Sequence, residues 1–280
     1  MATTDPAIVV VHGAWHTPSH YHSLLFNLNS AGYRHVYCPR LPSCSLSDAP
    51  SNPLPTAGDD AKVVHTVVHQ LRTEDANRHI ILILHSYGGV VGSEALGPSF
   101  DPIPGGLANI SLIYVAAFML PKFQSAAGAY VDPTYPIEGF EDGTALPKDP
   151  KYLFFNGLTD EMANEEARSI VKMSGVALRA EVGFEAWKVI GTTATSGGER
   201  DNNRIWYVVM EDDHAIPPDV QRRFVEGVRS EGVTVKEVGL SGPHTPWKDA
   251  RVVNRVVDTL REILTVLEID GQGQAGIAAC

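Results

Sequence analysis

The sequence has few cysteines and no long apolar run. Its 280 residues include three cysteines, Cys38, Cys44 and Cys280, an odd number without the C-x-x-C spacing of metal sites. This pattern argues against a disulfide framework and a zinc site, and it predicts reduced thiols in a cytoplasmic protein. No segment reaches the roughly 18 apolar residues of a membrane span, and the N-terminus lacks the basic region and apolar core of a signal peptide.

Basic residues are also scarce. The chain has 22 lysines and arginines against 33 aspartates and glutamates, which gives a net charge of −11. An acidic surface repels nucleic acid and anionic lipid, so we expect neither nucleic acid nor a membrane as a partner. The sequence leaves open whether the protein forms a homodimer.

Two sequence patterns resemble a cofactor site and a metal site, but the residues around them argue against both interpretations. Residues 271–276 match G-x-G-x-x-G, but no strand precedes them and the chain ends shortly afterwards. His65 and His69 lie one helical turn apart, but the glutamate of H-E-x-x-H is missing, so we expect both on a solvated helix face. We therefore predict that the protein uses neither a cofactor nor a metal.

What the sequence does contain is a series of short runs rich in valine and isoleucine. Most of them show no polar alternation, which is typical of strands buried on both faces of a parallel sheet. Segments with helical spacing of apolar residues lie between them. This alternation predicts one α/β domain with a mainly parallel sheet and helices on both faces. The expected strands cover residues 7–11, 35–38, 80–84, 111–116, 205–210 and 233–238.

One stretch interrupts the alternation. Residues 119–200 contain no convincing strand, so we expect an inserted helical lid there, a core formed by residues 1–118 and 201–269, and a disordered tail at 270–280. Apolar side chains in and beside the lid favour an apolar substrate, although packing explains many of them equally well. They are Phe118, Met119, Phe123, Tyr130, Tyr135, Phe140, Phe154, Phe155, Met162, Phe184 and Trp187.

Ser86 stands where an apolar run ends, in the sequence LHSYGG. A serine hydroxyl attacks carbonyl groups well only when it projects from the sheet and a base removes its proton. A sharp turn from strand to helix, the G-x-S-x-G elbow, meets the first condition. Gly88 fits this pattern and Gly89 adds a second small residue, but Leu84 occupies the upstream small position. Ser86 alone could equally be a polar strand end; an elbow requires a strained Ser86 backbone and a gap for Leu84.

Two further loops carry groups that acyl transfer needs. His12 and Gly13 end an early strand, so the backbone N–H of Ala14 can face an oxyanion together with the N–H of Tyr87. His244 lies in a loop rich in glycine and proline between the last strand and the last helix, a suitable place for a general base.

The acid that would orient His244 has three candidates after the strand at 205–210, namely Glu211, Asp212 and Asp213. We favour Asp213 because it lies three residues before Ile216, where the chain turns into a helix. The order Ser, Asp, His, each at the carboxyl end of a strand, is the chain order of the α/β-hydrolase triad. Open α/β sheets bind their ligands at that same edge.

The motifs VHGAWHTPSHY, LHSYGG, AIPPDVQ and PHTPW, in this order, resemble those of the α/β-hydrolases that include plant methyl-ester esterases and hydroxynitrile lyases, above all the fungal members of that group. The resemblance extends to about residue 269. It implies Ser86 as nucleophile, Asp213 as acid, His244 as base, and the amides of Ala14 and Tyr87 as the oxyanion hole.

The same resemblance bears on the reaction. Hydroxynitrile lyases of this group carry a threonine where this chain has Gly13, and a lysine directly after the catalytic histidine, where this chain has Thr245. Because both are missing, we expect serine-dependent hydrolysis of a carboxylic ester or lactone through an acyl-enzyme, without a cofactor. The alternatives are a lyase or C–C bond-cleaving enzyme on the same triad, and a non-catalytic ligand receptor.

The residues around the expected site have predicted roles of their own. We expect Trp15, His16 and Trp187 to line a substrate pocket. His12 and His85, which flank the loops, are expected to pack against neighbouring loops rather than to react.

Overall fold

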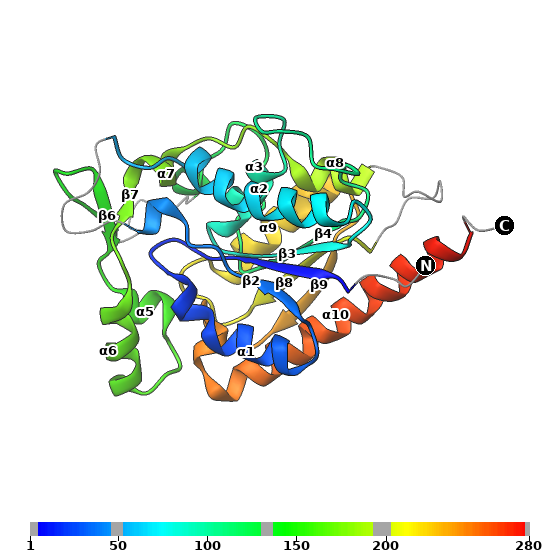
Figure 1. Ribbon diagram of the computed structural model, residues 1–280. Coiled ribbons are helices and arrows are strands. Elements are labelled where there is room, and N and C mark those ends of the chain that lie inside the picture. The colour runs from blue at the N-terminus through cyan, green and yellow to red at the C-terminus, as the bar shows by residue number, and fades with distance from the viewer. Residues whose placement is uncertain (1–4, 46–52, 130–136, 193–202, 278–280) are drawn as a thin grey trace.

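A six-stranded sheet forms the centre of the protein (Figure 1). The computed structural model describes residues 5–45, 53–129, 137–192 and 203–277. The strands follow the order β2-β1-β3-β4-β8-β9 and all neighbouring pairs are parallel, which confirms the predicted α/β class. They are β1 (Ala7–Val11), β2 (His35–Tyr37), β3 (Ile80–His85), β4 (Ile110–Val115), β8 (Ile205–Met210) and β9 (Lys236–Leu240).

Helices cover both faces of this sheet, as Figure 1 shows. One face carries α1 (His22–Ser30) and α10 (Ala250–Ile277). The other carries α2 (Ala57–Glu74), α3 (Gly88–Ala95), α8 (Ala186–Thr192) and α9 (Pro218–Ser230). Three short 3₁₀ segments, η1 (Pro18–Tyr21), η2 (Pro42–Cys44) and η3 (Pro246–Lys248), lie in the loops between strands and helices.

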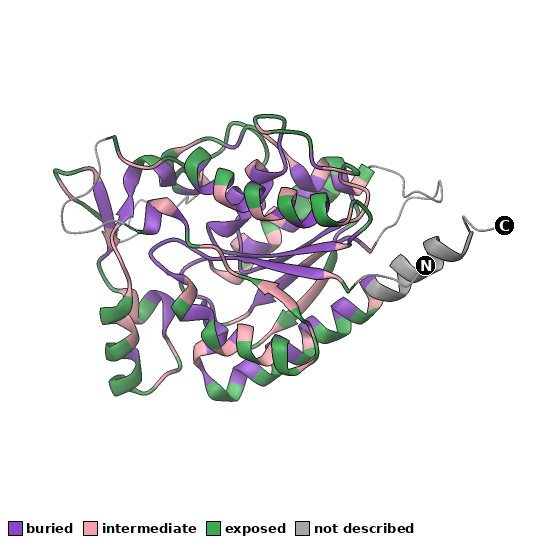
Figure 2. Ribbon diagram, viewed as in Figure 1, coloured by how far each residue is buried: buried purple, intermediate pink, exposed green. Residues whose placement is uncertain are grey.

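Successive residues of each central strand enter different cores. In β1, Ile8 and Val10 belong to the cluster under α1 and α10, whereas Val9 and Val11 belong to the cluster under α2 and α3. Neighbouring side chains of a strand point to opposite faces, so a strand covered on both sides is apolar at every position. This is why the runs lack polar alternation and why β1, β3 and β4 are buried along their whole length (Figure 2).

The insertion between β4 and β8 differs from the expected helical lid, because it also contains a three-stranded antiparallel sheet. Its strands are β5 (Ile137–Gly139), β6 (Thr144–Pro147) and β7 (Met173–Ser174), and its helices are α4 (Ala126–Ala129), α5 (Pro150–Phe154), α6 (Asp160–Ser169) and α7 (Gly175–Arg179). The expectation of no strand was wrong. Such short strands contain too few residues to establish a period of two in the sequence.

Two expected boundaries also differ from the structure. Helix α8 packs against α3, β4 and β8, so it belongs to the helices that cover the central sheet. The part of the insertion that stands apart from this sheet therefore ends before α8, and not at residue 200 as expected. Helix α10 continues to Ile277, where we expected a disordered tail from residue 270; residues 278–280 lie outside the described ranges. Extending an existing helix by a turn fixes few new dihedral angles for each bond gained, so glycines near its end need not stop it.

His65 is not on a solvated face, contrary to the expectation. Its side chain is buried, stacks on Phe100 at a ring-centroid distance of 4.8 Å, and its Nδ1 donates to the carbonyl of Ala95 at 2.8 Å. In the described part of the chain, no group of three or more His, Cys, Asp or Glu side chains is arranged to hold a metal. None of the helices in those ranges is both long and apolar enough to cross a bilayer.

Candidate active site

Ser86 follows β3 directly and has the left-handed backbone conformation that the elbow requires. Its φ is 53°, a region that residues other than glycine rarely occupy, and the expected strain is confirmed. Trp15 after β1 and Ala116 after β4 also have positive φ values, of 61° and 45°. Three adjacent strands of the sheet are therefore followed by strained residues at their carboxyl ends, the edge where open α/β sheets bind ligands.

The two glycines after Tyr87 let helix α3 start close against the sheet. A Cβ on Gly88 would lie 2.2 Å from the carbonyl oxygen of Val11, and one on Gly89 would lie 2.1 Å from that of Phe118. Both obstacles are backbone atoms, which cannot rotate away. The Gly-Gly pair is therefore required by the approach of α3 to the ends of β1 and β4.

Leu84 is buried in β3, as expected, and the space beside it comes from a glycine on the facing helix. A Cβ on Gly92 would lie 2.3 Å from Cδ2 of Leu84. In the usual elbow motif a small residue on the strand allows close packing of the helix. Here the large residue is on the strand and the small residue is on α3.

We expect Gly92→Ala to lower the free energy of unfolding by about 1–3 kcal/mol, because its methyl group overpacks the space of Leu84. Leu84→Ala alone leaves a cavity and costs about 2–5 kcal/mol. The double variant should lose clearly less than the sum, since the new methyl group enters the vacated space. Urea unfolding of the four proteins measures this; losses that add within about 0.5 kcal/mol would show that the two positions do not compensate.

The proposed oxyanion donors belong to the loop after β1, which carries Ala14, and to the residue directly after Ser86, Tyr87. No hydrogen bond from the N–H of Ala14 or of Tyr87 is found in the described ranges. Gly13 keeps the first loop close to the nucleophile, because a Cβ there would lie 2.9 Å from Cβ of Ser86.

The side chain of Tyr87 has a different task from its backbone N–H. It anchors the turn at Ser86 to helix α2. Its hydroxyl donates to Asp60 of α2 at 2.9 Å, and the other carboxylate oxygen of Asp60 accepts the N–H of Ser43 at 2.8 Å. Asp60 is fully buried, and this burial raises the pKa of its carboxyl to about 6.

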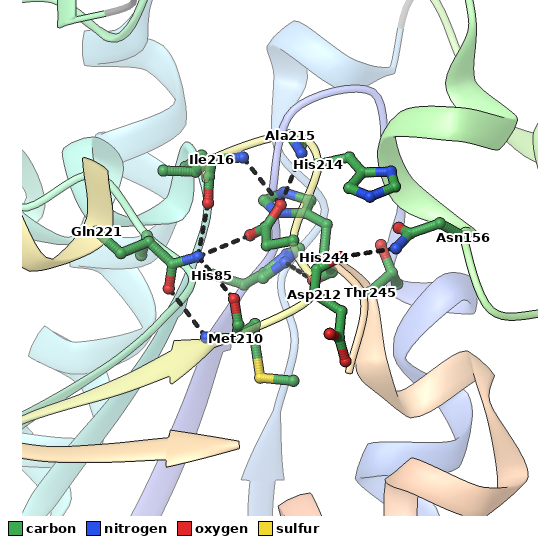
Figure 3. Close-up of polar contacts among 12 residues, drawn as sticks. His85, Asn156, Met210, Asp212, His214, Ala215, Ile216, Gln221, His244 and Thr245 are labelled. Atoms are coloured by element: carbon green, nitrogen blue, oxygen red, sulfur yellow. Dashed lines mark hydrogen bonds and ion pairs between the residues drawn. The ribbon is translucent and has the colours of Figure 1, made fainter. Parts of the chain in front are cut away.

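Asp213 and His244 form a buried pair. The Nδ1 of His244 donates to Oδ2 of Asp213 at 2.7 Å, and both side chains are almost completely inaccessible to solvent. The other oxygen, Oδ1, accepts the N–H groups of Ala215 and Ile216 at 2.7 and 2.9 Å (Figure 3). These donors hold the carboxylate in one orientation, and they leave Nε2 of His244 as the nitrogen that can accept a proton.

Gln221, on α9, completes the surroundings of Asp213. Its Nε2 donates to Oδ2 of Asp213 at 3.0 Å and to the carbonyl of Ile216 at 2.6 Å, and its Oε1 accepts the N–H of Met210 at 3.0 Å (Figure 3). Sequence reasoning did not single out this residue. The one available signal was a polar side chain at a position that helical spacing places on the buried face of α9.

The other two candidate acids have different partners. Glu211 forms an ion pair with Arg222, and Asp212 accepts the hydroxyl of Ser241 at 2.6 Å. Of the three adjacent carboxylates, only Asp213 has an ion-pair contact with His244 within the described residues.

The elbow and the loop of His244 lie against each other. The ring of His85, the residue before Ser86, has its centroid 4.7 Å from that of His244 and donates through Nε2 to the carbonyl of His244 at 2.9 Å. The hydroxyl of Ser86 makes no hydrogen bond in the described ranges. This is compatible with a nucleophile, since catalytic hydrogen bonds are often long before substrate binds.

Of the predicted pocket residues, Trp15 and His16 lie beside the site. Trp15 stacks on Phe154 with ring centroids 5.9 Å apart, and its indole N–H donates to the carbonyl of Ala145 at 2.9 Å. The centroid of the Phe154 ring lies 5.5 Å from that of His244 and 5.2 Å from that of His16. Phe154 therefore brings the insertion directly to the proposed base.

Trp187 is buried on α8, where its indole N–H donates to the carbonyl of Leu120 at 3.0 Å. In the described ranges it makes no hydrogen bond or ring contact with Ser86, Asp213 or His244. Of the remaining apolar residues named above, Phe118, Met119 and Phe155 are buried, Phe123 and Met162 are exposed, Phe140 and Phe184 are partly buried, and Tyr130 and Tyr135 lie outside the described residues.

His12 and His85 pack between loops, and each uses both ring nitrogens in hydrogen bonds. Nδ1 of His12 donates to the carbonyl of Gly13 at 2.9 Å, and its Nε2 accepts the N–H of Leu41 at 3.0 Å. Burial lowers the pKa of His12 to about 4, so the ring is neutral near pH 7. Through these hydrogen bonds, His12 connects the end of β1 to the loop before η2.

Comparisons with known proteins show the family and the fold of this chain. A family model described as "Alpha/beta hydrolase family" matches residues 8–256. The alpha/beta hydrolase nvfD of Aspergillus novofumigatus is 28% identical over 229 residues, which cover 79% of this chain and 83% of that protein. A pyrethroid hydrolase from Sphingobium faniae has a TM-score of 0.66 at 17% identity, over 92% of this chain and 97% of its own. A methylesterase from Arabidopsis has a TM-score of 0.65 at 17% identity, over 93% and 99%. At these identities the two structures show a shared fold.

Proposed function

The chain belongs to the alpha/beta hydrolase family, and from this membership we propose that it hydrolyses a carboxylic ester or lactone of an apolar small molecule, with Ser86 as nucleophile. The observation that carries the proposal is the buried 2.7 Å hydrogen bond from His244 to Asp213, with the ring of His244 4.7 Å from that of His85, the residue before the left-handed Ser86. A base oriented by a carboxylate and a projecting serine are the two requirements of this chemistry.

The proposed reaction uses these groups in order. Nε2 of His244 takes the proton of Ser86, and Oγ attacks the ester carbonyl carbon. The N–H groups of Ala14 and Tyr87 stabilise the negative oxygen that forms. As the intermediate collapses, His244 returns the proton to the departing alcohol and an acyl-enzyme remains. Water then attacks the acyl group, again losing its proton to His244, and the acid is released while Ser86 regains its hydrogen.

Two features favour hydrolysis over lyase chemistry at this site. Gly13 leaves no room for a side chain beside Ser86, so no hydroxyl at this position can hold a substrate oxygen. The residue after His244 is Thr245, and the nearby Lys248 pairs with Glu166 at 2.8 Å instead of supplying a positive charge for a departing anion. The intact Ser86, Asp213 and His244 also favour an enzyme over a non-catalytic receptor.

The insertion is proposed to act as a lid that makes the site apolar. The N–H of Val171 donates to the carbonyl of Trp15, and the N–H of Thr245 donates to that of Phe154. These bonds attach the insertion to the oxyanion loop and to the loop of His244. Together with the position of Phe154 beside the base, they support a substrate with an apolar acyl or alcohol part.

The proposal predicts hydrolysis of short aryl esters, release of the carboxylic acid, and complete inhibition by a fluorophosphonate that labels Ser86. Product analysis distinguishes the alternatives, because a lyase releases a carbonyl compound and consumes no water. Mandelonitrile should release cyanide no faster than in buffer alone. Cyanide release that disappears in Ser86→Ala, without any esterase activity, would assign the protein to the lyases. Binding of ligands without turnover or labelling would favour the receptor.

A further inference from the structure

Three hydrogen bonds connect the oxyanion loop to the loop of His244 through the interior of the protein. The N–H of Gly13 donates to the hydroxyl of Tyr21 at 2.8 Å, this hydroxyl lies 2.5 Å from Nδ1 of His85, and Nε2 of His85 lies 2.9 Å from the carbonyl oxygen of His244. All four residues are buried. We call these three bonds the Tyr21–His85 bridge.

One arrangement of protons satisfies every atom of the bridge. The carbonyl of His244 can only accept, so Nε2 of His85 carries a hydrogen. Burial, and after it the charge of the neighbouring His244, lowers the pKa of His85 well below its usual value, so the ring is neutral and its Nδ1 accepts from Tyr21. Burial raises the pKa of Tyr21 well above its usual value, which keeps the hydroxyl protonated. Each bond then has one donor and one acceptor.

Aromatic packing holds the bridge in place. The ring of Trp247, in η3, has its centroid 4.7 Å from the ring of Tyr21 and 4.7 Å from that of His85. Trp247 belongs to the segment that follows His244, so the same segment that carries the base also covers the bridge. The two side chains therefore cannot reorient without displacing that segment.

A second, longer connection joins the same two loops. Nδ1 of His16 donates to the carbonyl of Ala14 at 2.7 Å, and the hydroxyl of Thr245 lies 3.4 Å from Nε2 of His16. Burial lowers the pKa of His16 well below its usual value, so its Nε2 accepts from Thr245. The oxyanion loop is thus linked to the base loop on both sides of Ala14.

We propose that Tyr21 and His85 are positioning residues, which set the place of the oxyanion loop relative to Ser86 and His244. The inference rests on the proposed function. Neither side chain is placed to contact the substrate; they act through the backbone of Gly13 and of His244. An oxyanion donor is effective only within about 2.7–3.1 Å of the charged oxygen, and a shift of about 1 Å can cost a hundredfold in rate.

Removal of one oxygen tests the bridge. In Tyr21→Phe, Gly13 and Nδ1 of His85 lose their shared partner, and we expect kcat for an aryl ester to fall about 10- to 100-fold while KM changes less than about threefold. The matched control is Tyr114→Phe, which removes a buried hydroxyl from β4 outside the bridge and should leave kcat within about twofold. A folded Tyr21→Phe with the kcat of the wild type overturns the proposal.

A pair of variants at His85 tests the bridge without relying on Tyr21. In His85→Gln the amide can still accept from Tyr21 and donate to His244, whereas His85→Leu has a similar size and no polar atoms. We expect the glutamine variant to keep at least about tenfold more kcat than the leucine variant. Equal kcat values in the two would contradict a positioning role.

A spectroscopic measurement distinguishes a failure of this inference from a failure of the proposed function. Nitrogen NMR of the histidine side chains in the wild type should show His85 as a neutral ring with its proton on Nε2, and Tyr21→Phe should disturb this assignment. A proton on Nδ1 in the wild type overturns the bridge. A wild type that hydrolyses no ester, yet has the expected His85 tautomer, contradicts the proposed function instead.

Discussion

Ser86→Ala and His244→Ala are each expected to lower kcat for ester hydrolysis by about 10⁴- to 10⁶-fold, and the double variant should lose no more than the worse single variant. The reason is that the hydroxyl and the imidazole act in one step: without the base the hydroxyl is a weak nucleophile, and without the hydroxyl the base has no proton to take. Steady-state and single-turnover kinetics on the same aryl ester measure the losses.

A matched control for the histidine is available one residue past Asp213. His214 is exposed and stacks on Tyr152, with ring centroids 4.4 Å apart. His214→Ala should retain kcat within about threefold, because this ring takes no part in the proposed proton transfers. If His244→Ala retained most of the activity in a folded protein, another group would be the base and the assignment of His244 would be wrong.

Asp213→Asn is expected to lower kcat by about 10³- to 10⁴-fold, whereas Asp212→Asn should change it less than about threefold. The asparagine at 213 would present an amide N–H₂ group near Nδ1 of His244, or a carbonyl oxygen without charge. It would therefore favour the wrong tautomer and could not stabilise the imidazolium. Asp212 instead accepts the hydroxyl of Ser241, and the amide oxygen of an asparagine at this position can still accept it.

The two asparagine variants form a close pair, since they change adjacent residues in the same way. Thermal unfolding should be recorded for both, because Asp213 also accepts the N–H groups of Ala215 and Ile216. An inactive Asp212→Asn beside a nearly active Asp213→Asn would reverse the choice of acid. Equal losses in both variants would indicate that the loop as a whole, rather than one carboxylate, supports His244.

The comparison of hydrolysis with lyase chemistry depends on Gly13 and Thr245 in different ways. At Gly13 the restriction is steric, because Cβ of Ser86 and Nδ1 of His85 occupy the region a side chain would need. At Thr245 it is a matter of charge, because the hydroxyl is directed to His16 and cannot replace an ammonium group. A threonine at position 13 would therefore clash with His85 of the Tyr21–His85 bridge as well as with Ser86.

The fold class and the order of the site loops could be predicted from short stretches of sequence. Val9, Ile83 and their neighbours are apolar without alternation, and a strand covered on both faces requires this whichever helices cover it. Gly88 and Gly89 indicated a close approach after Ser86, and the structure shows which backbone oxygens come near. The choice of Asp213 rested only on its distance from Ile216 along the chain, and sequence could not show that its two neighbours have other partners.

What the sequence alone determined about this protein is therefore local: the strand runs, the turn at Ser86, and a serine, an acid and a histidine in the order of a hydrolase triad. The tertiary structure decided which residues contact one another across the fold. His85 reaches the carbonyl of a residue 159 positions away, Leu84 obtains its space from Gly92 on the facing helix, and Gln221 reaches Asp213 from α9. Periodicity and turn preferences act over a few residues and leave a pattern in the sequence. A hydrogen bond or a packing contact between distant segments depends on how helices and strands meet, and no local pattern records it.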